Sequence, residues 1–179
     1  MCAISRYLKK TRPGCITAFL GPCIAKKSEA ADPTIPDNAD YVITYGEFRA
    51  LMRSQGVEVK PADNSYQESS VWGKRFATSG GVAKAVENLV HETYPDMEIK
   101  TARAEGLREC RKLMTLAKAG KYNGYLLEGM ACPGGCVAGA GTIQPIKKSA
   151  AAVGLYSKEA PFESALESKY DITLPLLKD

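Results

Sequence analysis

The fold is decided by residues 125–136, which read Tyr-Leu-Leu-Glu-Gly-Met-Ala-Cys-Pro-Gly-Gly-Cys. The apolar run at 125–127 is typical of a buried strand, and the chain continues from it into two cysteines, Cys132 and Cys136. The Pro-Gly-Gly between the thiols permits sharp turns with positive φ and lets backbone N–H groups approach an anionic group. A plain loop between a strand and a helix needs fewer glycines, so this segment predicts metal or cluster binding.

A second cysteine segment occupies residues 21–29 and reads Gly-Pro-Cys-Ile-Ala-Lys-Lys-Ser-Glu. It follows a short apolar run at 15–20 that predicts another buried strand. Good helix formers predict a helix over 23–31, and Pro22 near its first turn loses nothing by lacking an N–H group. Each cysteine segment therefore begins just after a predicted strand.

The side chains of the second segment suggest a charged site. At a helix start, free N–H groups would stabilise the thiolate of Cys23. Lys26 would lie one turn further on the same face and would place a positive charge beside whatever Cys23 binds. Glu29 would either form an exposed ion pair with Lys26 or relay a proton, and both interpretations are open.

The rest of the chain alternates predicted strands and helices, which indicates parallel βαβ units in an α/β fold. Because ligands bind at the carboxyl ends of parallel strands, we expect both cysteine segments to converge on one site. Polar, aperiodic residues at 57–76 predict a long surface loop. Further strands are expected at 41–44 and 99–104, and helices at 1–10, 47–54, from 78–81 onward, 107–119, 147–156 and 162–170.

Size and composition narrow the possible functions. The 179 residues, 45% of them hydrophobic, suffice for one domain or two small lobes with a real core. A net charge of +4 without basic runs does not indicate a nucleic-acid partner. No apolar stretch is long enough to cross a membrane, and the absence of a signal peptide favours the cytoplasm. The abrupt helix at residue 1 suggests that natural sequence precedes it.

The six cysteines raise the questions of disulfides and zinc. A chain of this size needs no disulfide staples, and a reducing compartment disfavours them. Structural zinc sites favour a closer cysteine spacing than Cys132 and Cys136 have, and His91 is the only histidine. Cys15 and Cys110 are predicted to be small buried apolar residues. Four thiolates normally hold a 4Fe–4S cluster, and the two cysteine segments supply three.

The two cysteine segments closely resemble the second and third active-site signatures of the FeFe (iron-only) hydrogenases. The resemblance also covers the strand at 42–44 with the following Glu47, the helix start at 78–82 and the order of elements. It implies the α/β fold of that family, with the parallel-sheet βαβ layers of the iron-only hydrogenase large-subunit type, as a partial domain. Residues 1–179 would form the carboxyl-terminal portion of the H-cluster domain.

The family's H-cluster joins a 4Fe–4S cubane to a di-iron subcluster carrying CO, cyanide and an azadithiolate bridge. By resemblance, Cys23, Cys132 and Cys136 match three cubane ligands, and Cys136 matches the one whose sulfur also bridges to the di-iron unit. The family's first signature, Thr-Ser-Cys-Cys-Pro, is absent. It supplies the remaining ligand and the proton-transfer cysteine, and Cys2 and Cys15 lack its flanking residues.

The same resemblance assigns the di-iron pocket. Lys26 matches a lysine that hydrogen-bonds a cyanide, Pro22 lines the same pocket, and Met130 packs beside the di-iron subcluster. A cyanide nitrogen with negative charge in a dry cavity needs a fixed cation or donor, and lysine supplies both. Well-studied members carry methionine at the place of Gly21, so this chain is similar to a divergent branch.

The resemblance implies that the complete protein interconverts protons and H2. Its electrons would come from a ferredoxin-type donor or from upstream iron–sulfur domains, and its catalytic domain would include an amino-terminal part. The chain alone is expected to be inactive, with the H-cluster absent or incomplete. The alternatives are a non-catalytic hydrogenase-like iron–sulfur assembly factor, an H2-sensory domain and a zinc-binding structural α/β module. Lys26 and Met130 argue against the assembly factor, because they serve the di-iron pocket.

Overall fold

The computed structural model describes residues 1–58, 60 and 69–167, and its contacts divide the chain into two compact units. Among the described residues, unit 1 comprises 1–58, 60 and 139–143, and unit 2 comprises 69–138 and 144–167. None of the helices in the described ranges is both long and apolar enough to cross a membrane.

Unit 1 is built on two short parallel strands. Its elements are α1 (Cys2–Thr11), β1 (Ala18–Leu20), α2 (Ala25–Ala30), β2 (Tyr41–Ile43) and α3 (Tyr45–Ser54). Ala18 lies opposite Tyr41 and Leu20 opposite Ile43 in the parallel ladder. The Gly21 N–H donates to the Ile43 carbonyl at 3.1 Å, so the pairing extends one residue past β1 toward the cysteine segment.

Helix α3 begins two residues earlier than predicted because Thr44 caps it. The Thr44 hydroxyl accepts from the Glu47 N–H, and the Glu47 carboxylate accepts from the Thr44 N–H at 2.8 Å, which completes a capping box. Lys27 of α2 donates to the other Glu47 oxygen at 3.0 Å. The Thr44 N–H, followed by Lys27, lowers the pKa of Glu47 to about 2.

A second carboxylate of unit 1 has a similarly low pKa. The Lys9 ammonium, 2.8 Å from Asp40, and the Thr17 N–H lower the pKa of Asp40 to about 2. Both pKa values lie below the ordinary values of 4.5 for glutamate and 3.8 for aspartate. Folding is therefore favoured by the ionised carboxylates above those ordinary values, and this contribution is lost as the pH falls toward 2.

We predict that the urea midpoint is flat above about pH 5 and falls steadily between about pH 4.5 and 2. Glu47→Gln should flatten part of this fall, because the amide does not titrate, and it should lower the midpoint at pH 7. The exposed carboxylate Glu109 of unit 2 provides the matched control, Glu109→Gln. Equal acid slopes for Glu47→Gln and the unaltered chain would contradict the assignment.

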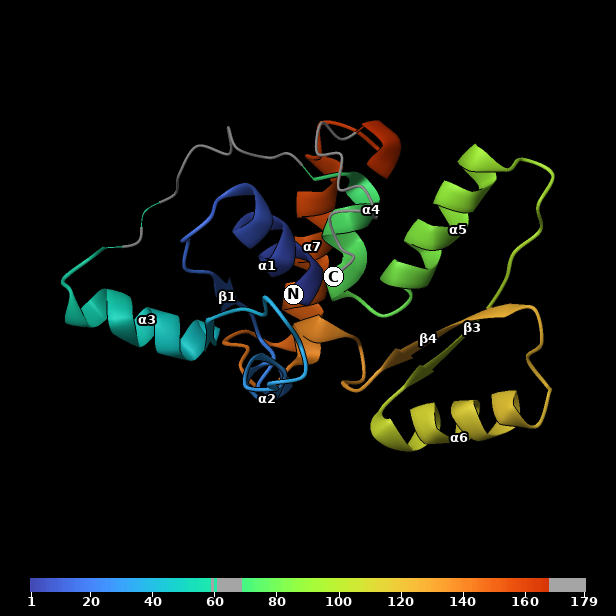
Figure 1. Ribbon diagram of the computed structural model, residues 1–179, viewed down its shortest axis with the longest axis horizontal. Helices are drawn as coiled ribbons and strands as arrows, with labels where there is room; N and C mark the ends of the chain where they lie inside the picture. Colours follow the sequence, from blue (N-terminus) through green and yellow to red (C-terminus); the bar gives the residue numbers. More distant parts are fainter. Residues whose placement is uncertain (59, 61–68, 168–179) are drawn as a thin grey trace. The chain divides into compact units, whose positions relative to one another are not determined.

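Unit 2 contains the second parallel pair and most of the helices. Its elements are α4 (Val71–Lys74), η1 (Arg75–Ala77), α5 (Gly81–Thr93), β3 (Lys100–Glu105), α6 (Leu107–Lys118), β4 (Tyr125–Met130), η2 (Cys136–Ala138), α7 (Ile146–Lys158) and η3 (Ala165–Glu167). Lys100 lies opposite Tyr125 and Glu105 opposite Met130. Figure 1 shows α6 and α5 on opposite sides of β3 and β4. The predicted α/β fold with parallel strands is confirmed.

Other predicted elements also differ from the structure. The predicted loop at 57–76 contains α4 and η1, because the Ser70 hydroxyl accepts from the Gly73 N–H at 3.0 Å and caps α4. The strand predicted at 15–20 begins only at Ala18 and is not buried, since Leu20 is 43% exposed. The helix predicted at 162–170 is reduced to the single turn η3, and residues 168–170 lie outside the described residues.

Candidate functional site

Cys23 lies in a tight turn between β1 and α2. Helix α2 begins at Ala25, two residues later than predicted, so Cys23 precedes the helix instead of starting it. The carbonyl of Pro22 accepts from the Gly141 N–H at 2.8 Å. A Cβ at Gly141 would lie 2.8 Å from Thr44 Cγ2, so only glycine allows this approach. The segment 139–143, which begins three residues after Cys136 in sequence, therefore packs on the turn that carries Cys23.

The Lys26 ammonium forms an ion pair with Glu29, three residues along α2. The other carboxylate oxygen of Glu29 accepts from the Cys2 thiol at 2.8 Å, and Cys2 also reaches Asn38 Oδ1 at 3.3 Å. Partial burial opposes the charge on Lys26, but the bond to Glu29 and its negative charge raise the lysine pKa overall. The Cys2 thiol, and then Lys26, lower the pKa of Glu29. Glu29 thus holds Lys26 as a fixed cation.

Cys2 is a thiol donor in this arrangement. Burial raises its pKa, and so do its hydrogen bond to Glu29 and the negative charge of that carboxylate. The raised pKa makes the Cys2 thiolate harder to form, which disfavours Cys2 as a metal ligand. Only the tertiary structure shows this contact, because 27 residues separate Cys2 from Glu29.

The second cysteine loop begins directly after β4 and ends at η2 (Figure 1). Cys132 is half-buried and Cys136 is exposed. The Cys132 carbonyl accepts from the Gly135 N–H at 2.9 Å, and both Gly134 and Gly135 have positive φ, 95° and 92°. Two consecutive residues with positive φ require glycine for practical purposes, and they turn the chain back so that the two thiols flank one loop.

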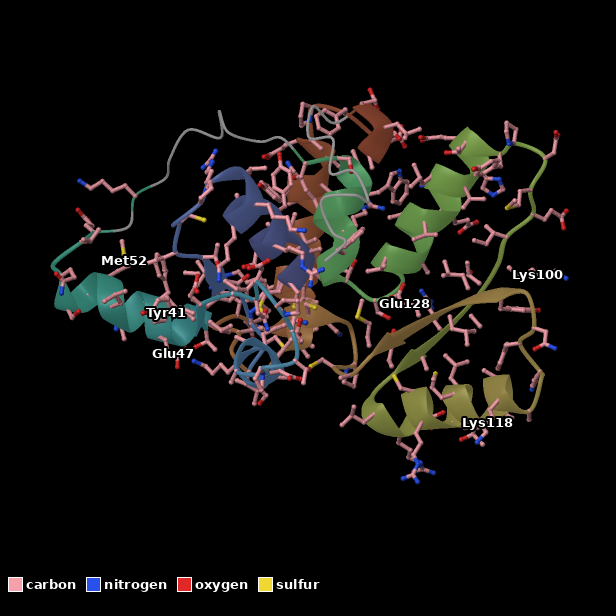
Figure 2. All side chains as sticks on the ribbon, in the orientation of Figure 1. Tyr41, Glu47, Met52, Lys100, Lys118 and Glu128 are labelled. Carbon is pink, nitrogen blue, oxygen red and sulfur yellow. The ribbon has the colours of Figure 1, made fainter. Side chains whose placement is uncertain are left out.

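One carboxylate binds a backbone N–H group of this loop, and a second binds two such groups at the start of α5. Glu105, the last residue of β3, accepts from the Gly134 N–H at 2.8 Å. Its pKa is lowered by the Ser79 side chain and by that N–H group. Glu128 of β4, labelled in Figure 2, is 7% exposed. Its two oxygens accept from the N–H groups of Gly80 and Ala83 at 2.6 and 2.7 Å.

The segment around Ser79 joins the loop to the helix. The Ser79 N–H donates to the Gly134 carbonyl at 3.1 Å. A Cβ at Gly135 would lie 2.6 Å from Ser79 N and 2.9 Å from the Ala77 carbonyl oxygen, so the two backbones are in direct contact. Sequence reasoning missed the roles of Glu105 and Glu128. Local sequence carries no signal for these roles, because each carboxylate binds a backbone N–H group far away in the sequence.

Cys110 and Cys15 lie outside the two cysteine segments. The Cys110 thiol of α6 lies 3.5 Å from the carbonyl oxygens of Ala104 and Met130, so it ties the helix to the ends of both strands. Cys15 precedes β1 instead of lying in it. Cys15 and Cys110 are half-buried, less than predicted, and no disulfide links the six cysteines, all of which lie in the described ranges.

The candidate site residues are divided between the two units. Met130 ends β4, and its carbonyl accepts from the Gly106 N–H at 2.8 Å. Cys132 and Cys136 share one loop of unit 2, whereas Cys23 belongs to unit 1. Within the described residues, no three cysteine, histidine, aspartate or glutamate side chains are grouped closely enough to hold a metal ion. The convergence of the three thiols stays a prediction.

A family model described as "Iron only hydrogenase large subunit, C-terminal domain" matches residues 1–140. The periplasmic Fe hydrogenase large subunit of Nitratidesulfovibrio vulgaris is 27% identical over 165 residues, which cover 73% of this chain and 39% of that relative. The cytosolic Fe-S cluster assembly factor narfl of Danio rerio is 28% identical over 164 residues, covering 69% of this chain and 40% of the relative. The chain thus spans about two fifths of these relatives.

Solved structures show the same fold. An FeFe-hydrogenase from Chlamydomonas reinhardtii superposes with a TM-score of 0.62 at 22% sequence identity. The match covers 94% of this chain and 61% of the neighbour. Both cysteine segments lie within the residues that the family model matches.

Proposed function

The chain belongs to the family of iron-only hydrogenase large subunits, and from this membership we propose that it supplies part of an H-cluster site. Cys23, Cys132 and Cys136 would provide three thiolate ligands of the cubane. The observation that carries the proposal is that both cysteine segments leave the carboxyl end of a parallel strand inside the matched region. Iron–sulfur clusters are held by thiolates, normally four of them. The three cysteines therefore fit a cluster site in their chemistry but supply one ligand too few.

The second cysteine loop suits an anionic cluster. Its glycines remove the side chains that would keep bulky inorganic atoms from the backbone. Glu105 binds the Gly134 N–H and the Ser79 N–H binds the Gly134 carbonyl, so the positions of Cys132 and Cys136 do not depend on the thiols alone. The cluster, when bound, supplies the redox chemistry, and the protein supplies ligands and donors.

Lys26 and Met130 extend the site toward a di-iron subcluster in this proposal. Lys26 would donate to a cyanide nitrogen, and the ion pair with Glu29 would keep the ammonium charged. Pro22 and Met130 would line the pocket beside it. Within a complete domain, these residues would support interconversion of protons and H2, with electrons from a ferredoxin-type donor or from upstream iron–sulfur domains.

A second candidate is an iron–sulfur assembly role without hydrogenase activity. It is favoured by the similarity to the assembly factor of Danio rerio, whose identity of 28% equals that of the hydrogenase relative within one percentage point. The two candidates share the cubane cysteines and differ at the di-iron subcluster. A test must therefore separate binding of iron and sulfide from hydrogen turnover.

We predict that anaerobic reconstitution of the 179-residue chain with iron and sulfide yields bound iron but no hydrogenase turnover. The reason is that one matched ligand and the matched proton-transfer cysteine are missing. Metal analysis, visible absorption and EPR report the cluster, and H2 evolution from reduced viologen reports turnover, with and without a synthetic di-iron cofactor.

Each outcome of this experiment decides between the candidates. Zinc in place of iron would favour the structural α/β module. Rapid H2 evolution would mean that the chain holds a complete ligand set. An adjoining amino-terminal part that restores turnover would support the hydrogenase, whereas iron binding without turnover in that longer protein would favour the assembly role.

A further inference from the structure

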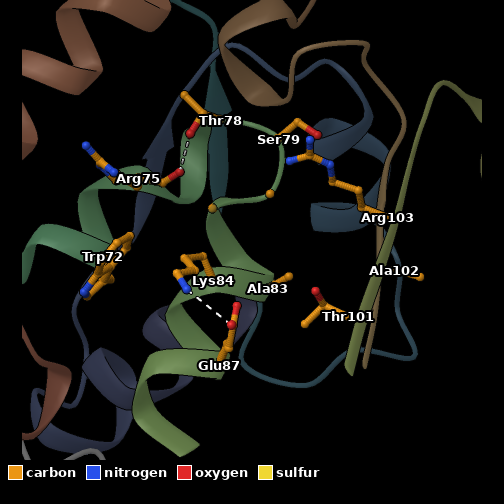
Figure 3. A pocket seen from close by; sticks show the side chains of 12 residues that line it. Trp72, Arg75, Thr78, Ser79, Ala83, Lys84, Glu87, Thr101, Ala102 and Arg103 are labelled. Atoms are coloured by element: carbon orange, nitrogen blue, oxygen red, sulfur yellow. Dashed lines mark hydrogen bonds and ion pairs between the residues drawn. The ribbon is translucent and has the colours of Figure 1, made fainter. Parts of the chain in front are cut away.

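Unit 2 contains a pocket that lies outside the cysteine loops. It has a volume of about 420 Å³ and opens between η1, the start of α5 and β3 (Figure 3). Its size falls in the range of small-molecule sites, about 300–1,000 Å³, and none of the cysteines lines it. Ser79, which touches the cysteine loop, forms one of its walls.

The charged side chains around this pocket are mostly cationic. Arg75, Lys84 and Arg103 line it, and Glu87 is the one acidic residue among its described lining. The Glu87 carboxylate is already engaged, because it lies 3.3 Å from the Lys84 ammonium (Figure 3). Neither Arg75 nor Arg103 forms a direct ion pair with a described residue, although the charge of Arg103 also acts on Glu105 outside the lining. The described lining therefore has an excess of positive charge.

Neighbouring backbone and side chains hold the two arginines in place. Gly80 has a φ of 82°, and a Cβ there would lie 2.6 Å from Arg103 Nη1, so the guanidinium rests directly on the glycine. Arg75 Nε donates to the Ser157 hydroxyl at 3.2 Å, and its guanidinium lies 5.3 Å from the Trp72 ring centroid. Such support lowers the entropy cost of ordering each arginine around a ligand.

The start of α5 is not what would attract an anion to the pocket. The Gly80 and Ala83 N–H groups are both occupied by the Glu128 carboxylate. The Thr78 hydroxyl donates to the Arg75 carbonyl, and the Ser79 side chain interacts with Glu105. The remaining donors are side chains: the guanidinium groups, the Lys84 ammonium and the Thr101 hydroxyl. Guanidinium and hydroxyl donors together match the oxygen atoms of a phosphate or carboxylate group.

We propose that this pocket binds a small molecule with clustered oxyanion groups, with Arg103 as the main anchor and Arg75 as the second cation. Phosphate esters and polycarboxylates share this chemistry, and Trp72 and Ala102 offer an apolar wall for the rest of the ligand. The site is separate from the proposed cluster and does not depend on it. Because Ser79 lines the pocket and also binds the cysteine loop, a bound ligand would influence that loop through Ser79.

The single tryptophan of the chain makes the proposal directly measurable. Trp72 lines the pocket, so its fluorescence should change saturably when pyrophosphate, ATP or citrate is titrated into the full chain without metal. Isothermal titration calorimetry measures the same binding independently. We expect Arg103→Gln to weaken the binding by about tenfold or more, since a charge-assisted contact is lost. Arg108→Gln is the matched control, because Arg108 is 96% exposed on α6 and lies outside the pocket.

The choice of probes distinguishes a phosphate ligand from a carboxylate ligand. Binding of pyrophosphate and ATP but not citrate would identify a phosphate ligand, and the reverse would identify a polycarboxylate. The proposal is overturned if neither fluorescence nor calorimetry detects binding of any probe up to about 10 mM. It is also overturned if Arg108→Gln weakens the binding as much as Arg103→Gln, or if only an acidic peptide binds.

Discussion

Serine in place of Cys132 or Cys136 is expected to abolish stable iron binding by the reconstituted chain. Each substitution removes one thiolate from a set that is already incomplete, and a serine hydroxyl is a poor ligand for iron–sulfur clusters. Cys23→Ser should have the same effect if the three thiols share one cubane. The measurement is iron and sulfide per chain after anaerobic reconstitution and desalting, with the visible absorption of the cluster as a second readout.

Three other cysteines provide matched controls for this experiment. Cys110 and Cys15 are assigned to packing, and Cys2 is a protonated donor to Glu29. Serine at any of these positions should leave the iron content within about 20% of that of the unaltered chain. A large loss in Cys2→Ser alone would identify Cys2 as a fourth ligand. Full iron retention in both Cys132→Ser and Cys136→Ser would refute the assignment of the loop.

Gly135→Ala should be the most destabilising small substitution in the cysteine loop. Its φ of 92° is costly for alanine, and the new Cβ would lie 2.6 Å from Ser79 N, where neither backbone can move freely. We expect a loss of about 3 kcal/mol or more in the free energy of unfolding, because strain and overpacking add. Urea unfolding followed by circular dichroism measures this loss.

Gly124→Ala isolates the contribution of the close contact. Gly124 also has a positive φ, 77°, but a Cβ there would meet nothing within 4 Å. Its cost should therefore be only about 1–2 kcal/mol, the penalty for a left-handed alanine. Equal losses for the two variants would mean that the contact between Gly135 and Ser79 does not constrain the loop. Gly135→Ala should also reduce iron retention, whereas Gly124→Ala should not.

The order of strands and helices was predictable because local sequence patterns specify it. Apolar runs, helical periodicity and glycine or proline boundaries placed β2, α5, β3, α6, β4 and α7 within a few residues of their observed positions. The alternation of strand and helix also predicted parallel strands, and the structure pairs β1 with β2 and β3 with β4 in parallel. The position of each cysteine segment directly after a strand followed from the same patterns.

Local patterns failed where a distant contact decided the structure. Helix α4 forms inside a polar segment that reads as loop, and its Lys74 ammonium lies 3.9 Å from the ring centroid of Tyr156 on α7. Helix α2 begins at Ala25 and not at Cys23 as predicted. The turn before the helix is bound to Gly141, which lies more than a hundred residues away in sequence. No periodic pattern in the sequence indicates the formation of α4 or the later start of α2.

Cysteine spacing, glycine density and the nearby lysine were enough to mark the candidate cluster ligands, because ligand chemistry requires those residue types close together in sequence. The groups that stabilise the chain around these candidate ligands could not be identified from local sequence. Glu105, Glu128 and the contact from Cys2 to Glu29 act across 27 to 48 residues, and carboxylates at such positions look like ordinary charged residues. Their roles depend on which backbone N–H or thiol the folded chain brings within hydrogen-bonding distance, and only tertiary packing decides that.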